Sequence, residues 1–499
     1  MLAAGATDTP IVRTPSGSVR GTKLATSTRF LGVPFAKPPV GPLRFKAPQD
    51  VEPWPGVRDA LAYASSPLQK PLGPKTLFPD ALQYSEDALY LNIWAPSATG
   101  PHPVYVFIHG GGNIGGTSAM PIYDGEHFAA NGIVFVSITY RVGVFGFLDV
   151  SKLLGDAYKG SGNNGLLDQI KALQWIKHNI AAFGGDPRNV TVGGQSAGAK
   201  NVIALMVAPQ AKGLFHKAIS ESGGGHTFAN QQTAHELADS VLKTLGATDP
   251  QALLSSTGDA LLAAQYSVVG QYPRKFPFRS VIDNVVLDSA PFDAVVKGRG
   301  ADIPLLLGYC SDEMAFYGPS KNGDGAITAQ DIGNMPLDQM QQLYTHYPQL
   351  YPGLDNERLR YKAVTAESYF IPTIRLAQAR AKTGARSYLY NFNLAPDSGK
   401  FKDLVVHGSE LPLTFDNLND STAPFIGPMG PTAQGLSKVM HQAWLTFIRH
   451  GKNVHAGGLD WPAYSLKERS TMVFDKEVRI SHDLQAAECE LWSKWTPVA

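Results

Sequence analysis

Cysteine is nearly absent from this chain of 499 residues, which contains only Cys310 and Cys489. Two cysteines cannot build a disulfide framework, and neither stands in the C-x-x-C spacing of a zinc or redox site. The sequence leaves open whether the two pair with each other. No cluster of His, Cys, Asp and Glu has metal-ligand spacing either, so we expect no metal ion and no other cofactor.

A surplus of charge and a long apolar run are also missing. The 43 Lys and Arg residues balance the 42 Asp and Glu residues, which excludes the basic footprint of a nucleic-acid-binding protein. No uncharged apolar run reaches the roughly 18 residues that a membrane-spanning helix needs, so we expect no membrane span.

The first ten residues, "MLAAGATDTP", are mostly small and lack a charged region before them. Such a start fits what is left when Met1 replaces a removed signal peptide, and it fits an ordinary frayed terminus equally well. The first alternative predicts a secreted or periplasmic protein.

Two kinds of apolar segment alternate along the chain. Short β-branched and aromatic runs predict buried strands at 133–141, 190–194, 303–308 and 387–392, and the segment 104–112 reads as a buried strand that runs into a glycine loop. Apolar residues at helical spacing predict helices at 165–183, 197–208 and 435–451. Alternating strands and helices are typical of an α/β fold, a mostly parallel sheet with helices on both faces. The stretches 225–280 and 315–385 are interpreted as helical insertions on one core, not as separate domains.

One serine stands in the segment "GGQSAGAKN" (193–201), where Gly194 and Gly198 flank Ser196 in a G-x-S-x-G pattern. A predicted strand precedes it and a predicted helix follows, so the glycines allow a tight turn that lifts the serine above the sheet edge. A chain with 50 glycines produces such patterns by chance, and a structural turn is the alternative. As a nucleophile, Ser196 needs a base to remove its proton.

A second glycine loop, "HGGG" (109–112), follows the buried strand upstream. Acyl transfer through a tetrahedral intermediate needs backbone N–H groups aimed at the developing oxyanion, and a glycine loop supplies them without side chains in the way. The residue after the nucleophile supplies another N–H. We therefore assign Gly111, Gly112 and Ala197 to an oxyanion hole.

An acid and a histidine should follow the serine in chain order. "LLLGYCSDEMAFY" places Asp312 and Glu313 just past a buried strand, and either carboxylate suits the position. "VVHGSEL" places His407 after a short apolar run, although the chain has 13 histidines and position alone does not select it.

Several long blocks resemble the type B carboxylesterases, the α/β-hydrolase family that also contains the cholinesterases. They are "FLGVPFAKPPVGPLRFKAP", "SEDALYLNIWAP", "YRVGVFGFL", "GNNGLLDQIKALQWIKHNIAAFGGDPRNVTVGGQSAG" and "DWPAY". The resemblance runs from about residue 10 to 495 and implies one α/β-hydrolase domain over that range. It also implies a triad of Ser196, Glu313 and His407, because the family's acid and histidine blocks match "SDEM" and "HGSE". In that triad His407 takes the serine proton and Glu313 orients the imidazole.

The chain departs from the family pattern around the serine. Gln195 replaces the glutamate usually found before the nucleophile, and Lys200 replaces a small residue in the first turn after it. Asn113 follows the oxyanion glycines where an aromatic residue is common.

Two further departures lie in blocks that resemble the acyl-pocket segments of the family. Arg274 falls at an aromatic position of "YPRKFPFRSVID", with Lys275 and Arg279 close by, and His226 lies in another such block. Each basic residue by itself could equally face solvent. Together they favour an acyl group that carries carboxylates, since arginine pairs bidentately with a carboxylate.

We therefore expect a metal-free serine carboxylic ester hydrolase whose partner is a small-molecule ester of a di- or tricarboxylic acid. Within the family, a fumonisin esterase fits such a pocket, because it removes tricarballylate from a long amino-alcohol backbone. One alternative is a broad-specificity carboxylesterase for neutral alkyl or aryl esters. Another is a non-catalytic adhesion protein on the same fold, as the neuroligins are, although those lack the nucleophile. The oligomeric state is left open.

Overall fold

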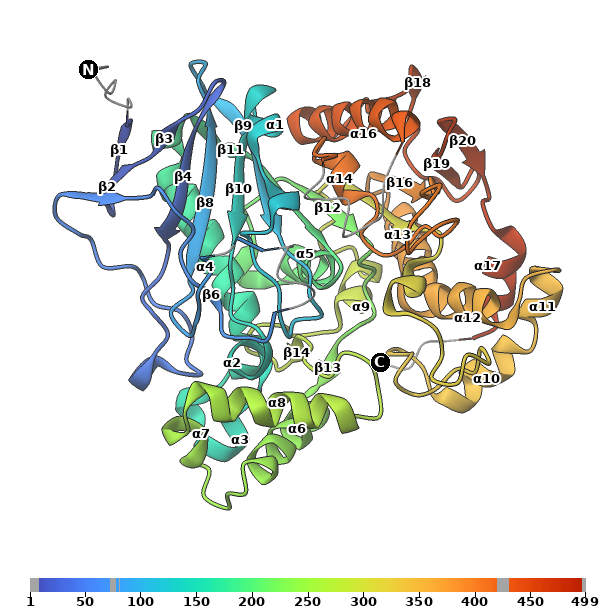
Figure 1. The fold of residues 1–499 in the computed structure, drawn as a ribbon, viewed down its shortest axis with the longest axis horizontal. Coiled ribbons are helices and arrows are strands. Elements are labelled where there is room, and N and C mark those ends of the chain that lie inside the picture. Colours follow the sequence, from blue (N-terminus) through green and yellow to red (C-terminus); the bar gives the residue numbers. More distant parts are fainter. Residues whose placement is uncertain (1–8, 72–77, 80, 420–429, 496–499) are drawn as a thin grey trace.

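A twisted sheet of eleven strands runs through the protein, and Figure 1 shows its strands between the surrounding helices in the computed structural model. The structure describes residues 9–71, 78–79, 81–419 and 430–495. Residues 1–8, most of the segment interpreted as a possible processed terminus, lie outside the described residues. Across the sheet the strands are β20 (Arg479–His482), β19 (Ser470–Phe474), β16 (Ser387–Phe392), β15 (Leu305–Cys310), β12 (Lys217–Glu221), β11 (Gly185–Gln195), β9 (His102–Ile108), β10 (Val134–Ile138), β8 (Tyr90–Pro96), β4 (Ser27–Pro34) and β3 (Thr22–Lys23).

The strands from β19 to β10 are parallel to their neighbours, and the remaining pairings at both edges are antiparallel. Parallel neighbours place their carboxyl ends at one edge of the sheet, where the loops that follow β9, β11, β12, β15 and β16 meet. The prediction of an α/β fold with a mostly parallel sheet is confirmed.

Helices cover both faces because successive side chains of each buried strand point to opposite sides. On β9, Val104, Val106 and Ile108 join one apolar cluster, while Tyr105 and Phe107 join the other. The first cluster contains residues of α4 (Asn164–Asn179), α5 (Ala197–Val207) and α13 (Ile371–Lys382). The second contains residues of α1 (Glu126–Ala130), α14 (Leu411–Thr414) and α16 (Pro431–His450).

The predicted elements differ from the observed ones mainly at their ends. The expected helix 165–183 is α4, which ends at Asn179 and passes into a 3-10 turn (Ile180–Phe183). The expected strand 190–194 is the inner part of the longer β11. The predicted late helix starts four residues earlier than expected, at Pro431, and stops at His450, since Gly451 adopts a left-handed conformation with φ 63°.

Both stretches interpreted as insertions are helical. The first holds α6 (Gln231–Thr244), α7 (Ala252–Ser255) and α8 (Gly258–Gln271), which lie together at the bottom of Figure 1. The second holds α10 (Leu337–Tyr344), α11 (Tyr347–Leu350), α12 (Asn356–Thr365) and a π-helical turn (Ala366–Phe370) that continues into α13. That the whole range 10–495 is one domain stays a prediction.

The remaining short elements lie around this framework. They are α2 (Gly143–Phe147), α3 (Ser151–Leu154), α9 (Pro291–Val296), α17 (Ala486–Ser493), β1 (Ile11–Thr14), β2 (Gly17–Arg20), β5 (Val57–Asp59), β6 (Ser66–Pro67), β7 (Tyr84–Ser85), β13 (Ala229–Asn230), β14 (Val281–Ile282), β17 (His455–Ala456) and β18 (Leu459–Asp460). Cys310 and Cys489 are both free thiols.

Over the part of the chain that the structure describes, no helix is both long and apolar enough to cross a membrane.

A buried ion pair joins the segment after β10 to α4. The guanidinium of Arg141 donates to both carboxylate oxygens of Asp168, at 2.9 and 2.7 Å, and the two side chains are 4% and 0% exposed. Removing one partner would leave the other as an uncompensated charge in the core.

Asp168→Ala is therefore expected to lower the free energy of unfolding by about 3–5 kcal/mol. The matched control is Asp59→Ala, which removes the carboxylate of the exposed pair Arg20–Asp59 and should cost less than about 1 kcal/mol. Denaturant unfolding followed by tryptophan fluorescence measures both. Equal effects of the two substitutions would show that Arg141 does not depend on its partner.

Candidate active site

The serine of the G-x-S-x-G segment occupies the sharp turn between β11 and α5. Ser196 has φ 60° and ψ −123°, a strained conformation for a residue other than glycine. A Cβ on Gly198 would lie 2.1 Å from the carbonyl oxygen of Ile108, and one on Gly194 would lie 2.6 Å from the backbone of Gly198. Both flanking positions must therefore be glycine, because the helix packs directly on the ends of two strands.

Glu313 and His407 meet at the same edge of the sheet. Glu313 follows β15 at the start of a 3-10 turn (Glu313–Tyr317), and its Oε1 accepts from the backbone N–H of Cys310 at 2.8 Å. Its Oε2 accepts a short hydrogen bond from Nδ1 of His407. Both side chains are buried. Because the Nδ1 proton faces the carboxylate, the lone pair of the imidazole is on Nε2.

Asp312, the other acidic candidate, points elsewhere. Its carboxylate forms an ion pair with Lys362 at 2.8 Å and accepts from the backbone N–H of Val405 at 3.2 Å. Asp312 therefore holds the segment that leads to His407, whereas Glu313 contacts the imidazole itself.

The Nε2 edge of the imidazole faces the serine turn. Nε2 of His407 lies 3.2 Å from Nε2 of Gln195, the residue before Ser196, and accepts from that amide. Among the hydrogen bonds of the described residues, none joins Ser196 to His407 directly; such catalytic bonds often close only when substrate binds. The Ser196 hydroxyl instead lies beside the phenol of Tyr369.

Tyr369 is a residue of this site that the sequence analysis missed. It lies in the π-helical turn before α13, is fully buried, and its ring centroid is 4.7 Å from that of His407. Its hydroxyl is 3.4 Å from that of Tyr317. Burial raises its pKa well above the ordinary value, so the phenol stays neutral. A π-turn often marks a functional site, but no sequence pattern predicts it.

The glycine loop after β9 lies against the serine turn. Gly111 and Gly112 have φ 115° and 63°, conformations that favour glycine, and a Cβ on Gly110 would lie 2.9 Å from Cβ of Ser196. Gly112 and Ala197 line the same pocket as Ser196. Ala197 is also the first residue of α5, where helix N–H groups point outward and favour negative charge.

This pocket is a small hollow beside Ser196 that is partly open to solvent. Phe228, Phe276 and Phe278 give it apolar walls, and Lys200 and Asn113 add polar groups. The side-chain oxygen of Asn113 accepts from the amide of Asn201 at 3.2 Å.

Lys200 is buried inside the pocket rather than turned to solvent. Its ammonium lies 5.4 Å from the ring centroid of Phe276 and 5.2 Å from that of Tyr369. Burial, followed by the charge of Arg279, lowers its pKa to about 8. Among the described residues its ammonium makes no ion pair. It is therefore a cation near two aromatic faces that has no anionic partner within the described part of the chain and lies in the same pocket as Ser196.

Arg279 and Lys275 belong to the loop between α8 and β14. The guanidinium of Arg279 donates to the carbonyls of Phe276, Lys275 and Gly333 at 2.7, 2.7 and 2.9 Å, so it clamps the backbone of this loop. The ammonium of Lys275 lies 3.5 Å from the ring centroid of Tyr317, and burial lowers the pKa of this lysine to about 7.

Two predicted substrate contacts are not brought to the serine. Arg274 is exposed and does not line the pocket, because the loop turns at Phe276 (φ 56°) so that the next residues face inward and Arg274 faces out. His226 lines a different cavity with Arg375, stacked 4.2 Å from the ring centroid of Phe292. Burial lowers its pKa to about 3, so His226 is neutral.

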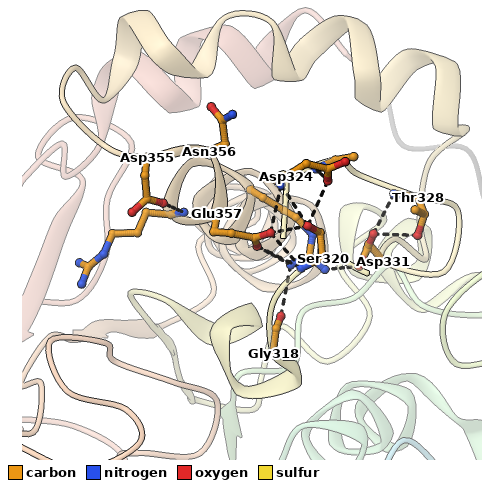
Figure 2. Close-up of polar contacts among 12 residues, drawn as sticks. Gly318, Ser320, Asp324, Thr328, Asp331, Asp355, Asn356 and Glu357 are labelled. Atoms are coloured by element: carbon orange, nitrogen blue, oxygen red, sulfur yellow. Dashed lines mark hydrogen bonds and ion pairs between the residues drawn. The ribbon is translucent and has the colours of Figure 1, made fainter. Parts of the chain in front are cut away.

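A carboxylate cluster anchors the loop that follows the 3-10 turn of Glu313 (Figure 2). Glu357 on α12 accepts from the backbone N–H groups of Ser320 and Gly325, each at 3.0 Å, and from the hydroxyl of Ser320. Arg360 pairs with Asp331 and donates to the carbonyl of Gly318. The carboxylates are thus occupied by N–H and O–H donors. Within the described ranges no group of three His, Cys, Asp or Glu side chains is arranged to hold a metal ion.

The chain is similar to known proteins over nearly its whole length. The Carboxylesterase family model matches residues 8–492. The para-nitrobenzyl esterase of Bacillus subtilis (strain 168) is 36% identical over 483 residues, which is 95% of this chain and 96% of that protein. The fumonisin B1 esterase of Sphingopyxis macrogoltabida is 33% identical over 497 residues, which is 96% of this chain and 88% of that protein. The solved structure of a thermophilic PNB esterase superposes with a TM-score of 0.86 at 33% identity, covering 96% of this chain and 99% of that one.

The packing of the serine turn makes a prediction that needs no substrate. Gly198→Ala would push a methyl group against the carbonyl of Ile108 and displace Ser196, and misplacement of a reacting atom by about 1 Å costs roughly 100-fold in rate. Labelling of Ser196 by a fluorophosphonate probe should slow by about this factor. Gly270→Ala, at a helical glycine with open space around it, is the control and should label like the unmodified protein. Equal labelling of both variants would mean that the turn tolerates a side chain.

Proposed function

The chain belongs to the carboxylesterase family and is a hydrolase of carboxylic esters, and from this premise we propose both its catalytic residues and its preferred substrates. Ser196 is the nucleophile, His407 the general base and acid, and Glu313 the group that orients the imidazole. The preferred esters carry a negatively charged acyl group, that of a di- or tricarboxylic acid such as the tricarballylate esters of fumonisin.

The reaction begins when the ester carbonyl enters between the serine turn and the glycine loop. The hydrogen bond from the Gln195 amide to Nε2 of His407 breaks. Nε2 then takes the Ser196 proton as Oγ attacks the carbonyl carbon. Negative charge moves to the carbonyl oxygen, where the N–H groups of Gly111, Gly112 and Ala197 stabilise it. Nε2 then returns the proton to the leaving alcohol, and an acyl-enzyme remains.

Water completes the cycle through the same groups. Nε2 of His407 removes a proton from the water that attacks the acyl carbon, and Ser196 leaves with that proton. The bond from Nδ1 to Glu313 stabilises the positive imidazolium in both halves of the reaction, because the carboxylate stays ionised beside it.

The observation that carries the substrate proposal is the unpaired ammonium of Lys200 in the pocket. A buried cation without a carboxylate partner is costly, and the two aromatic faces compensate for only part of its lost hydration. A carboxylate on the acyl group would supply the missing partner through a charge-assisted hydrogen bond. Arg279, rather than Arg274, is the second cation that lines the pocket, although its guanidinium is already bound to backbone carbonyls. Lys275 does not line the pocket and lies against Phe276 and Tyr317.

The alternative, a broad esterase for neutral esters, draws its support from the three phenylalanines that line the pocket. Apolar walls accept alkyl and aryl acyl groups without any charge. The two proposals share the catalytic residues and differ only in how strongly Lys200 selects the acyl group.

The identity of the acid is tested by a pair of isosteric substitutions. Glu313→Gln keeps the volume but removes the acceptor of the Nδ1 proton, and an orienting carboxylate replaced in this way costs up to about 10⁴-fold in kcat. Asp312→Asn leaves the imidazole contact in place and should cost less than about tenfold. Steady-state hydrolysis of p-nitrophenyl butyrate measures both. The opposite ranking would assign the role to Asp312.

The acyl preference is tested with Lys200→Met, which keeps the stem and removes the charge. The loss of one charge-assisted hydrogen bond, worth about 1.5–3 kcal/mol, should lower kcat/KM by about 10- to 100-fold for a hemisuccinate or tricarballylate ester. For a neutral ester of similar size the change should be small. The exposed Lys212→Met serves as the charge control.

The pH dependence of the same preference provides an independent check. Because the pKa of Lys200 is about 8, the ammonium is present below that pH and is lost above it. The ratio of kcat/KM for anionic over neutral esters should therefore fall as the pH rises through about 8 in the unmodified enzyme and stay flat in Lys200→Met. A flat ratio in both would remove the anionic-acyl proposal and leave the triad untouched.

A further inference from the structure

Two carboxyl groups that the proposed mechanism does not use are fully buried under the site. Glu221 and Glu410 are each 0% exposed. Glu221 is the last residue of β12, and its carbonyl accepts from the backbone N–H of Ser196 at 2.9 Å. Glu410 lies three residues after His407 in the loop that leads into α14. The pair therefore stands between the segment of the nucleophile and the segment of the base.

The hydrogen-bond partners of the two carboxyls are neutral groups. Oε1 of Glu221 accepts from the indole N–H of Trp444 at 2.9 Å, and Oε2 of Glu410 accepts from the thiol of Cys310 at 2.9 Å. Oε2 of Glu221 and Oε1 of Glu410 are buried and, among the described residues, have no hydrogen bond of ordinary geometry. The hydroxyl of Ser222 lies close enough to Glu410 to lower its pKa, an effect smaller than that of burial. An ionised carboxylate in such a place would have only a few neutral donors and no exposure to solvent, which is too little to compensate for its lost hydration.

Among the described residues, no positive group is a cause of the pKa shifts of the two carboxyls. The titratable groups that act on the two carboxyls are each other, Glu313 of the triad, the thiol of Cys310, and the phenols of Tyr105, Tyr123 and Tyr390. All of these are neutral or negative. Burial, followed by the negative charge of Glu313, raises the pKa of Glu410 to about 8, and burial, followed by Glu410, raises that of Glu221 well above the ordinary value.

We propose that Glu221 and Glu410 are positioning residues that stay protonated in the working enzyme, so that Glu313 is the one ionised carboxylate beside the imidazole and the His407 loop stays seated against the strand end behind Ser196. This inference rests on the triad proposed above. It adds to that triad two buried, uncharged carboxylic acids, Glu221 and Glu410. Their charge state decides whether His407 stays in place.

The consequence of losing a proton follows from like-charge repulsion. An ionised Glu410 would place a second desolvated negative charge close to Glu313, and it would be driven toward water together with the loop that carries His407. The fold also gains stability from holding these protons. Because the folded pKa of Glu410 lies above that of an unfolded carboxyl, the gain is complete below about pH 4.5 and is lost progressively as the pH rises toward about 8.

Kinetics as a function of pH provide the first test. With a neutral ester, kcat/KM of the unmodified enzyme should fall on the alkaline side with an apparent pKa near 8. Glu410→Gln, which keeps the shape and cannot ionise, should move this falling limb upward by about one pH unit or more. Glu488→Gln is the matched control, because Glu488 is another buried carboxyl with a raised pKa, bound to Tyr347 and Tyr351 on the far side of the insertion. It should leave the profile unchanged.

Two further measurements do not depend on turnover. Infrared difference spectra between neutral and alkaline pH should show the carbonyl stretch of a protonated carboxylic acid, reduced in Glu410→Gln and in Glu221→Gln. The melting temperature of the unmodified protein should fall more steeply with rising pH than that of Glu410→Gln. If Glu410→Gln does not fold, Glu221→Gln carries the same comparison.

Coincident alkaline limbs in the unmodified enzyme and Glu410→Gln would overturn the positioning role, even if the infrared band is present. Absence of the band at neutral pH would overturn the protonated pair itself. Failure of the triad proposal is seen separately, as full activity of Glu313→Gln.

Discussion

The close packing of α5 on the ends of β9 and β11 is the constraint on which the site depends. The backbone of Gly198 approaches the carbonyl of Ile108 so closely that no side chain fits between them. This contact forces the chain through the strained turn at Ser196 and brings the glycine loop alongside it. The helix N-terminus, the loop amides and the serine hydroxyl thus share one small volume because three backbone segments meet there, before any side chain contributes.

Most of the framework of this site could be predicted from the sequence, because it depends on local backbone rules. Ser196 and the glycine loop follow from patterns that span a few residues. The choice between Asp312 and Glu313 needed the family resemblance, since adjacent carboxylates look alike until the strand end fixes their directions. Arg274, His226 and Tyr369 could not be placed, because a positive φ at Phe276, a separate cavity and a π-turn decide where those side chains lie.

Charge is divided in space around the imidazole. Within the part of the chain that the structure describes, the Lys200 ammonium lies near two aromatic rings and forms no ion pair with a carboxylate, and Glu221 and Glu410 each keep one buried oxygen without a hydrogen bond of ordinary geometry. Among these described residues the Lys200 ammonium lacks an anionic partner, and the two buried carboxyls lack the hydration that an ionised carboxylate needs. The negative acyl groups that we propose would supply the anion beside Lys200, whereas the two carboxyls avoid their charge by staying protonated.

The order of strands in the sheet has a consequence for how the protein folds. Ser196, Glu313 and His407 come from segments about a hundred residues apart, and each reaches the site only after its own strand has paired with a neighbour. A chain rich in such distant pairings has a high contact order, and proteins of this kind fold slowly and through partly assembled states. An intermediate that lacks one strand would hold secondary structure and a core but no working site. Recovery of hydrolysis during refolding therefore reports the final assembly of the sheet, whereas recovery of helical circular dichroism reports earlier events.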